Sequence, residues 1–226
     1  MAELKIDWAS YKSAKYACEN WHYSGVIPVG KLVKVGVWED GKFIGVVLFG
    51  RGANNNLGKA FNLRQDQICE LVRVALKAHE TPVTRVVSIA IKFLKKSNDG
   101  LRLIVSYADS GQGHYGIIYQ AGNWVYDLSS TATSTMINGV KYHNKSVHSK
   151  YGFNGLQRLL DAGINAKHIK DSPKFRYLMP LDKKMRRKIK SLSKPYPKRP
   201  GSVDSCTVSS QDKSGGANPT PGLNYG

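Results

Sequence analysis

The chain has 226 residues and carries 34 lysines and arginines against 16 aspartates and glutamates, a formal charge of +18 at pH 7. Its 41% hydrophobic content can bury a core, which excludes a wholly disordered chain. No apolar run approaches the roughly 20 residues that span a bilayer, and the N-terminus lacks the apolar core of a secretion signal. A protein this basic usually meets a polyanion, with nucleic acid first and an anionic membrane surface second.

The three cysteines, Cys18, Cys69 and Cys206, are widely spaced. Their number and spacing match neither a metal motif nor a disulfide framework. We therefore expect the protein to work in a reducing cytoplasm. The oligomeric state stays open at this point between a monomer and a homodimer.

Half of the excess positive charge lies in one segment near the C-terminus. Residues 183–199 contain nine lysines and arginines, among them Arg186 and Arg187, and no acidic residue. Residues 200–226 are mostly Gly, Pro, Ser, Asn and Thr, which cannot bury enough apolar surface to offset their ordering entropy. We predict a basic segment over 182–199 and a disordered tail over 200–226, with disorder beginning at Ser191. The basic run contacts a phosphate backbone or forms a solvated face.

The front of the chain predicts a helix and a hairpin. Trp8–Asn20 has apolar side chains every three to four residues, which predicts a helix capped by Asp7. Leu32–Trp38 and Phe43–Phe49 are apolar, β-branched runs on either side of Asp40-Gly41, and this arrangement indicates a β-hairpin.

The middle of the chain predicts a strand, a helix and a second strand. Ile68–Leu76 is a strand whose alternation places Glu70, Val72 and Val74 on one face and Leu71, Arg73 and Ala75 on the other. Thr81-Pro82 opens an amphipathic helix with Thr81 as its cap. Leu101–Ala108 is a buried strand, so the two strands form a parallel pair with a right-handed crossover.

A Gly-rich loop, a short helix and further strands follow. Residues 109–113 form the loop, His114–Ala121 the helix, and Phe175–Pro180 the last strand. Residues 129–170 include a predicted hairpin turn at Asn138-Gly139 and basic residues that suit phosphate contacts or a solvated loop, namely Lys141, Lys145 and Lys150. The pattern predicts an α/β fold over 1–181, with helices on both faces of a mixed sheet and with 129–170 as a DNA-contacting insertion.

Two loops carry candidate site residues. The helix start at Thr81, Thr84 and Arg85 offers unpaired N–H groups to a phosphate, although ordinary capping explains it equally well, and neither a P-loop nor a dinucleotide-binding motif is present. Asp109 and His114 follow a buried strand, where ligands bind in open α/β sheets. Each residue also suits an ordinary turn or helix terminus.

Several segments, in order, resemble the Mom family of phage DNA-modification proteins. They are Trp21–Ser24, Gly36–Gly45, Phe49–Asn54, Glu70–Arg73, Asp109–His114 and Ile118–Trp124. The resemblance spans about Trp21 to Leu181 and implies the fold of the GNAT acyltransferase superfamily. It also implies modification of the N6 amine of adenine in double-stranded DNA to methylcarbamoyl-adenine, which shields phage DNA from host restriction. The usual glycine-rich CoA signature is absent, because residues 77–88 contain no glycine.

The same resemblance implies cofactors and site residues. Acetyl-CoA is the implied acyl donor, and iron is a proposed further cofactor. The family's functional positions fall on His22, Tyr23, Arg73, Asp109 and Tyr119. Nitrogen and oxygen ligands suit iron, which makes His22, Tyr23 and Asp109 the candidate ligands, and His114 would complete the more usual set of two histidines and one carboxylate. The implied CoA contacts lie on the central strand and the following helix at Val74, Leu76, Thr81, Thr84, Arg85 and Ser88.

Residue chemistry is compatible with these roles. Attack by the weakly nucleophilic adenine amine needs a proton acceptor, for which Asp109 or His22 serves and Glu70 is a further candidate. Arg73 or a strand N–H can stabilise the developing oxyanion. Two other functions stay open: a GNAT acetyltransferase acting on a protein or small amine, and a DNA-binding protein without catalysis.

Overall fold

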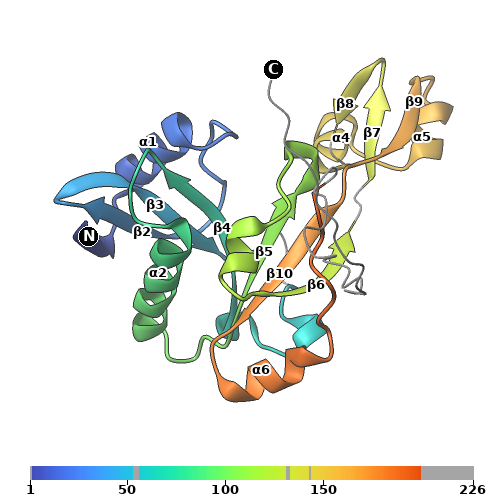
Figure 1. The fold of residues 1–226 in the computed structure, drawn as a ribbon. Helices are drawn as coiled ribbons and strands as arrows, with labels where there is room; N and C mark the ends of the chain where they lie inside the picture. Colours follow the sequence, from blue (N-terminus) through green and yellow to red (C-terminus); the bar gives the residue numbers. More distant parts are fainter. Residues whose placement is uncertain (1, 53–55, 131–132, 143, 200–226) are drawn as a thin grey trace, which may run out of the picture.

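The computed structural model contains a seven-stranded sheet and a separate three-stranded sheet (Figure 1). It describes residues 2–52, 56–130, 133–142 and 144–199, so the tail expected over 200–226 lies outside the described residues. The large sheet is ordered β1 (Leu4–Trp8), β2 (Leu32–Glu39), β3 (Lys42–Gly50), β4 (Ile68–Leu76), β5 (Leu103–Asp109), β10 (Lys174–Pro180) and β6 (Val125–Ser130). Among the described helices, none has the length and apolarity needed to cross a membrane.

The first predicted helix begins later than expected. Trp8 ends β1, which pairs with β2, and α1 (Tyr11–Trp21) starts three residues further on. Ser10 is its N-cap, because its hydroxyl accepts a hydrogen bond from the Ser13 N–H at 3.0 Å. The prediction of Asp7 as the cap was wrong. Trp8 continues the spacing of apolar residues seen in the helix, although it belongs to the edge strand β1. The periodicity of the sequence alone therefore did not show where the strand ends and the helix begins.

The hairpin and the parallel pair are confirmed. β2 and β3 are antiparallel around a turn in which Asp40 and Gly41 have φ values of 49° and 74°. These left-handed conformations suit a short hairpin turn. β4 and β5 are parallel and are connected through α2 (Val83–Ser97). The N-cap of α2 is Pro82, which supplies no side-chain cap, so the prediction of Thr81 in that role was wrong.

Helices cover both faces of the large sheet, as predicted. On one face, Val86, Ala90 and Leu94 of α2 pack against Val47 and Ile104. On the other face, Ala14 and Cys18 of α1 pack on Leu48, while α6 (Lys183–Lys190) packs under β5 and β10. Successive residues of a strand pack on opposite faces of the sheet, so a strand such as β3 contributes side chains to both layers of helices.

The structure revises the middle of the chain. β5 begins at Leu103, and Asp109 leads into a 3-10 turn, η3 (Ser110–Gln112). The short helix predicted from His114 is α3 (Ile117–Ala121), because Gly113 and Gly116 both have positive φ and interrupt the helix before Ile117. The predicted strand over Trp124–Tyr126 and the last strand over Phe175–Pro180 are confirmed as β6 and β10.

Residues between β6 and β10 form a small unit at the upper right of Figure 1. β7 (Thr133–Ile137), β8 (Val140–Tyr142) and β9 (Ala166–Lys170) form its sheet, with the predicted Asn138-Gly139 turn between β7 and β8. Two helices follow in this unit, α4 (Asn144–Tyr151) and α5 (Leu156–Asp161). Its core of Ile137, Val147, Leu159 and Ala166 is separate from the core clusters of the large sheet.

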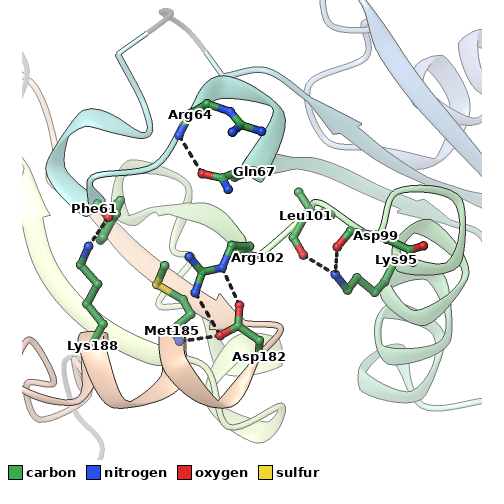
Figure 2. Close-up of polar contacts among 10 residues, drawn as sticks. All are labelled: Phe61, Arg64, Gln67, Lys95, Asp99, Leu101, Arg102, Asp182, Met185 and Lys188. Atoms are coloured by element: carbon green, nitrogen blue, oxygen red, sulfur yellow. Dashed lines mark hydrogen bonds and ion pairs between the residues drawn. The ribbon is translucent and has the colours of Figure 1, made fainter.

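The basic segment is folded, which corrects the prediction of disorder from Ser191. α6 buries Met185 and Ile189 against Phe61, while Lys188 donates a hydrogen bond to the Phe61 carbonyl at 2.6 Å (Figure 2). Asp182 caps the helix by accepting from the Met185 N–H and also pairs with Arg102. The sequence interpretation missed this helix because its apolar stripe consists of only Met185 and Ile189 among charged residues.

Replacing Asp182 with Asn is expected to destabilise the fold by about 1–2 kcal/mol near neutral pH, because both the cap and the ion pair lose charge. Arg102 lowers the pKa of Asp182 to about 2. The stabilisation that the Asp182 carboxylate contributes is therefore complete at a pH above the pKa that Asp182 has in the unfolded chain. It is lost as the pH falls toward 2. Urea unfolding at several pH values checks this: a variant that matches the wild type at pH 7 would contradict it. Asp161→Asn, on the exposed end of α5, is the control.

Candidate active site between β4 and β5

The candidate site lies where the parallel strands part. β4 and β5 pair only from Ile68 with Leu103 to Leu71 with Ser106. Beyond that point β4 continues along β3, and β5 continues along β10. The main-chain groups of residues 72–76 that face β5 therefore have no strand partner on that side. We call this parting of the two strands the opening.

A bulge in β4 decides which side chains face the site. Leu48 pairs with Arg73 and Phe49 with Leu71, so Val72 is an extra residue. Leu71 and Val74 both lie on the face of the sheet that α2 covers, whereas Ala75 lies on the face that α1 covers. These are called the α2 face and the α1 face below. The predicted strict alternation of β4 was therefore wrong.

The bulge also brings two charged side chains to one face. Glu70 now shares the α1 face of the sheet with Arg73, although strict alternation placed them on opposite faces. Glu70 lines a pocket of about 310 Å³ together with Arg51 and Val72. It hydrogen-bonds with no described side chain, and burial raises its pKa, an effect that Lys174 partly offsets. A carboxyl group in this setting is a candidate proton acceptor.

Arg73 and His22 form the second part of the site. Arg73 donates a hydrogen bond from its guanidinium to His22 Nδ1 at 3.1 Å, and the Ser24 N–H also donates to Nδ1. Because a guanidinium cannot accept, Nδ1 is the unprotonated nitrogen and Nε2 carries the proton. Burial, with smaller effects of Arg73 and His114, lowers the pKa of His22 to about 4. Since Nδ1 is already occupied, this arrangement favours a carboxylate over His22 as the base.

One buried donor at the site has no protein partner. Arg73 Nε is buried and hydrogen-bonds with no described atom. An unpaired buried N–H is costly, which makes it available to an oxyanion of a bound substrate.

Aromatic rings bridge the two sides of the opening. Tyr23 contacts His22 at a ring separation of 4.2 Å and His114 edge-on at 4.7 Å. Because Tyr23 follows α1 and His114 follows η3, these contacts join the β4 half of the sheet to the β5 half. Asp109 accepts a hydrogen bond from the Gly111 N–H and lies 3.8 Å from Lys174 Nζ. Burial raises the pKa of Tyr23, and Asp109 raises it further.

Tyr119 reaches the point where the strands separate. Ser106 Oγ lies 2.8 Å from the Leu71 carbonyl oxygen and 2.7 Å from Tyr119 Oη. A carbonyl only accepts, so Ser106 gives its single proton to Leu71 and Tyr119 donates to Ser106. Burial raises the pKa of Tyr119 to about 12, which keeps the phenol protonated at neutral pH. The sequence interpretation missed Ser106, although it is the one polar residue in the apolar and aromatic run from Leu103 to Ala108.

The expected CoA contacts are divided between two places. Val74 and Leu76 pack toward α2, while Thr84 and Ser88 line a pocket of about 260 Å³ that also includes Ile118. Arg85 is exposed. The N–H groups of Glu80 and Thr81 donate to the Glu39 carboxylate at 2.9 and 2.8 Å.

Glu39 therefore occupies the Thr81 amide expected for a phosphate, and the hydrogen bonds from the Thr81 side chain and from the Glu80 and Thr81 N–H groups lower the pKa of Glu39. Sequence reasoning did not find Glu39, because it lies 42 residues before Thr81. Pro82 provides no side-chain cap for the first turn of α2, and the Arg85 N–H donates to the Pro82 carbonyl at 2.9 Å, so the N–H groups of Val83 and Thr84 are the ones that suit a phosphate.

The expected iron ligands are a poor fit to iron. In the part of the chain that the structure describes, no three His, Cys, Asp or Glu side chains are grouped to hold a metal. The unprotonated nitrogen of His22 faces the Arg73 guanidinium, whose positive charge opposes a cation there. No chemical step at this site is therefore derived through iron.

The expected DNA contacts are spread over two ends of the molecule. Lys141 is ion-paired with Asp171 at 2.6 Å, and Lys150 donates to Tyr142 Oη at 3.2 Å. Lys145 belongs to α4, but its side chain lies outside the described residues. Arg186 and Arg187 are exposed on α6, at the lower edge of Figure 1 and away from the small sheet.

A seven-stranded mixed sheet whose single parallel pair parts beside a buried serine and tyrosine defines an α/β protein with its candidate site between two strands. The chain belongs to the Mom protein family, whose family model matches residues 3–198. The methylcarbamoylase Mom of Escherichia phage Mu is 25% identical over 209 residues, which cover 87% of this chain and 84% of that protein.

Solved acetyltransferases give looser matches. A putative acetyltransferase from Acinetobacter baylyi matches with a TM-score of 0.46 and 10% identity over 80% of this chain and 94% of that one. A Bacillus subtilis acetyltransferase solved with CoA has a TM-score of 0.42 and 12% identity, covering 80% of this chain and all of that one. A GNAT-family acetyltransferase from Streptococcus pneumoniae has a TM-score of 0.45, 12% identity and the same coverage.

Proposed function

We propose that this chain transfers an acyl-derived group from acetyl-CoA to the exocyclic N6 amine of adenine in double-stranded DNA. The final product is methylcarbamoyl-adenine, which protects phage DNA from restriction in the host cytoplasm. Acyl transfer forms the bond to N6 and releases the CoA thiol. The additional NH of the methylcarbamoyl group comes from a separate nitrogen donor together with a two-electron oxidant. The observation that carries the proposal is the opening between β4 and β5, where a candidate base, an unpaired buried donor and a buried phenol meet. Membership in the Mom family supports it.

The α2 face suits the acyl donor. The first turn of α2 provides N–H groups for phosphates, and Val74 and Leu76 give an apolar lining for the pantetheine arm. The thioester then lies at the opening, within reach of Arg73 Nε and the Tyr119 phenol. Arg73 stabilises the oxyanion, and the leaving thiolate takes up the proton that the base removes from the amine or a proton from water, while Tyr119 stays hydrogen-bonded to Ser106.

The α1 face suits the adenine. A base inside a duplex is inaccessible, so it must leave the stack before its amine is modified. The pocket beside Glu70 and Arg51 lies on this face. Glu70 accepts the proton of the attacking amine, and Asp109 is the alternative acceptor. The Tyr23 ring offers a stacking surface at the opening, because its side chain is 58% exposed.

The small unit after β6 suits the DNA backbone. Its exposed lysines lie near the C-terminal ends of β5 and β6, where the site opens, and would contact phosphates rather than bases. Because Lys141 and Lys150 are already held by Asp171 and Tyr142, they provide preorganised charge. Arg186 and Arg187 would meet DNA only if it extends along the sheet to α6.

Plasmid DNA from cells that express this protein should contain adenosine enlarged by a methylcarbamoyl group, as measured by mass spectrometry of digested nucleosides. A methylcarbamoyl group differs in mass from an acetyl group by one NH, so the product also identifies the transferred group. Glu70→Gln, which removes the proposed base, should slow the modification strongly while DNA affinity stays near that of the wild type. Arg64→Ala, an exposed change far from the opening, should retain activity.

Two outcomes would contradict this function. The first is unmodified DNA from cells in which the folded protein is abundant. The second is consumption of acetyl-CoA with a protein or small amine in the absence of DNA, which would favour an ordinary amine acetyltransferase. DNA binding that is unaffected by Glu70→Gln, without modification by either form, would favour a non-catalytic DNA-binding protein.

A further inference from the structure

The last described residues form a strap along the body of the protein. We use the name C-terminal strap for Lys194–Arg199. The Lys194 N–H donates to the Tyr126 carbonyl at 2.9 Å, so the segment docks on the edge strand β6. Tyr196 donates from its hydroxyl to the Trp124 carbonyl at 2.7 Å and stacks near Tyr177. These contacts return the chain from α6 toward α3.

The strap is joined to the helix that carries Tyr119. Gln120 of α3 donates to the Tyr115 carbonyl at 2.8 Å and to Tyr177 Oη at 3.1 Å. Its amide nitrogen also lies 3.3 Å from the Pro197 carbonyl oxygen, so one of its two protons is shared between two acceptors. One side chain therefore connects the strap, the loop before α3 and β10. A segment held at several points is a structural element rather than a frayed end.

The strap ends in a pocket at the candidate site. Arg199 lines a pocket of about 240 Å³ together with Tyr107, His114 and Tyr119. The pocket combines aromatic walls with a guanidinium, a group that binds phosphate in a bidentate manner.

We propose that the C-terminal strap is a wall of the active-site pocket and places Arg199 there as a phosphate-binding residue. The ligand class is a phosphate or pyrophosphate carried by a substrate with an apolar or aromatic part that packs on the tyrosines. Within the proposed function, the phosphate belongs either to the CoA donor or to the DNA strand beside the target adenine. The full positive run over 183–199 therefore divides into α6, far from the site, and a strap that reaches it.

The test uses the full chain and two separate binding measurements. CoA binding is measured by calorimetry without DNA, and binding of a short duplex is measured by fluorescence anisotropy without CoA, at one fixed salt concentration. Arg199→Ala should weaken one of the two by about tenfold, with partial recovery in Arg199→Lys. Arg64→Ala removes the same charge at the opposite end of the large sheet and should change neither by more than about twofold. Weakened CoA binding assigns the phosphate to the donor, and weakened duplex binding assigns it to DNA.

A second variant tests the strap itself. Tyr196→Ala removes the ring and the hydroxyl that dock the strap, so trypsin should cleave after Lys198 faster and ligand binding should weaken as in Arg199→Ala. Faster cleavage with unchanged binding of both ligands would overturn the proposal. So would an Arg199→Ala variant equal to Arg64→Ala in both assays, or a wild-type chain that binds neither ligand.

Failure of the role proposed for the C-terminal strap can be told apart from failure of the proposed function. Arg199-dependent binding by a chain that leaves plasmid adenine unmodified would contradict only the proposed function. Normal modification by an Arg199→Ala variant with unaltered binding would contradict only the role of the strap.

Discussion

Glu70→Gln is expected to slow DNA modification by about 10²–10⁴-fold, the usual contribution of a general base. Glutamine keeps the size of the side chain but cannot accept the proton of the adenine amine. The single-turnover rate of adenine modification, followed by nucleoside mass spectrometry, measures the effect. Glu19→Gln on the exposed surface of α1 is the matched control and should match the wild type.

The pH dependence separates the two candidate bases. Burial raises the pKa of Glu70, so the rate should rise with pH through a value above the ordinary range of a glutamate. That rise should disappear in Glu70→Gln, while Asp109→Asn should retain it. A Glu70→Gln variant that keeps both the wild-type rate and the pH profile would transfer the role of base to Asp109.

Asp127→Ala is expected to destabilise the fold by about 3–5 kcal/mol, because it leaves the Arg176 guanidinium buried and unpaired. The pair joins β6 to β10 through several hydrogen bonds, and the Asp127 side chain is 3% exposed. Urea unfolding measured by circular dichroism gives the change in free energy.

A double variant tests whether the stability lost in Asp127→Ala comes from leaving Arg176 without its carboxylate partner. Asp127→Leu combined with Arg176→Met replaces both charges with apolar groups and should recover much of the lost stability. A single Asp127→Ala variant within about 1 kcal/mol of the wild type would show that water or a neighbouring group compensates Arg176. Asp161→Ala on the exposed end of α5 is the control for loss of a carboxylate.

Much of the large sheet could be predicted because its signals are local. Asp40-Gly41 specifies the hairpin, and the spacing of Val86, Ala90 and Leu94 specifies α2. The edge strand β1 was missed because its five residues follow no period that differs from the helix after them. The small sheet was predicted only as one hairpin, since β9 pairs with β7 across about 30 residues of sequence.

The candidate site could be predicted only in part. Sequence motifs identified His22, Arg73, Asp109 and Tyr119 as residues to examine, and the structure places them around one opening. The bulge at Val72 could not be predicted, because nothing in the apolar sequence of β4 indicates where pairing with β3 slips by one residue. Arg199 was overlooked because its position depends on contacts that begin more than 60 residues earlier in the chain.

The separate core of the unit between β6 and β10 has an evolutionary consequence. Ile137, Val147, Leu159 and Ala166 pack among themselves and their neighbours in that unit, not against the large sheet. Substitutions on its outer surface therefore leave the packing around Ser106 and Tyr119 unchanged. The surface of this unit can therefore change from one chain to another without disturbing the residues of the candidate site.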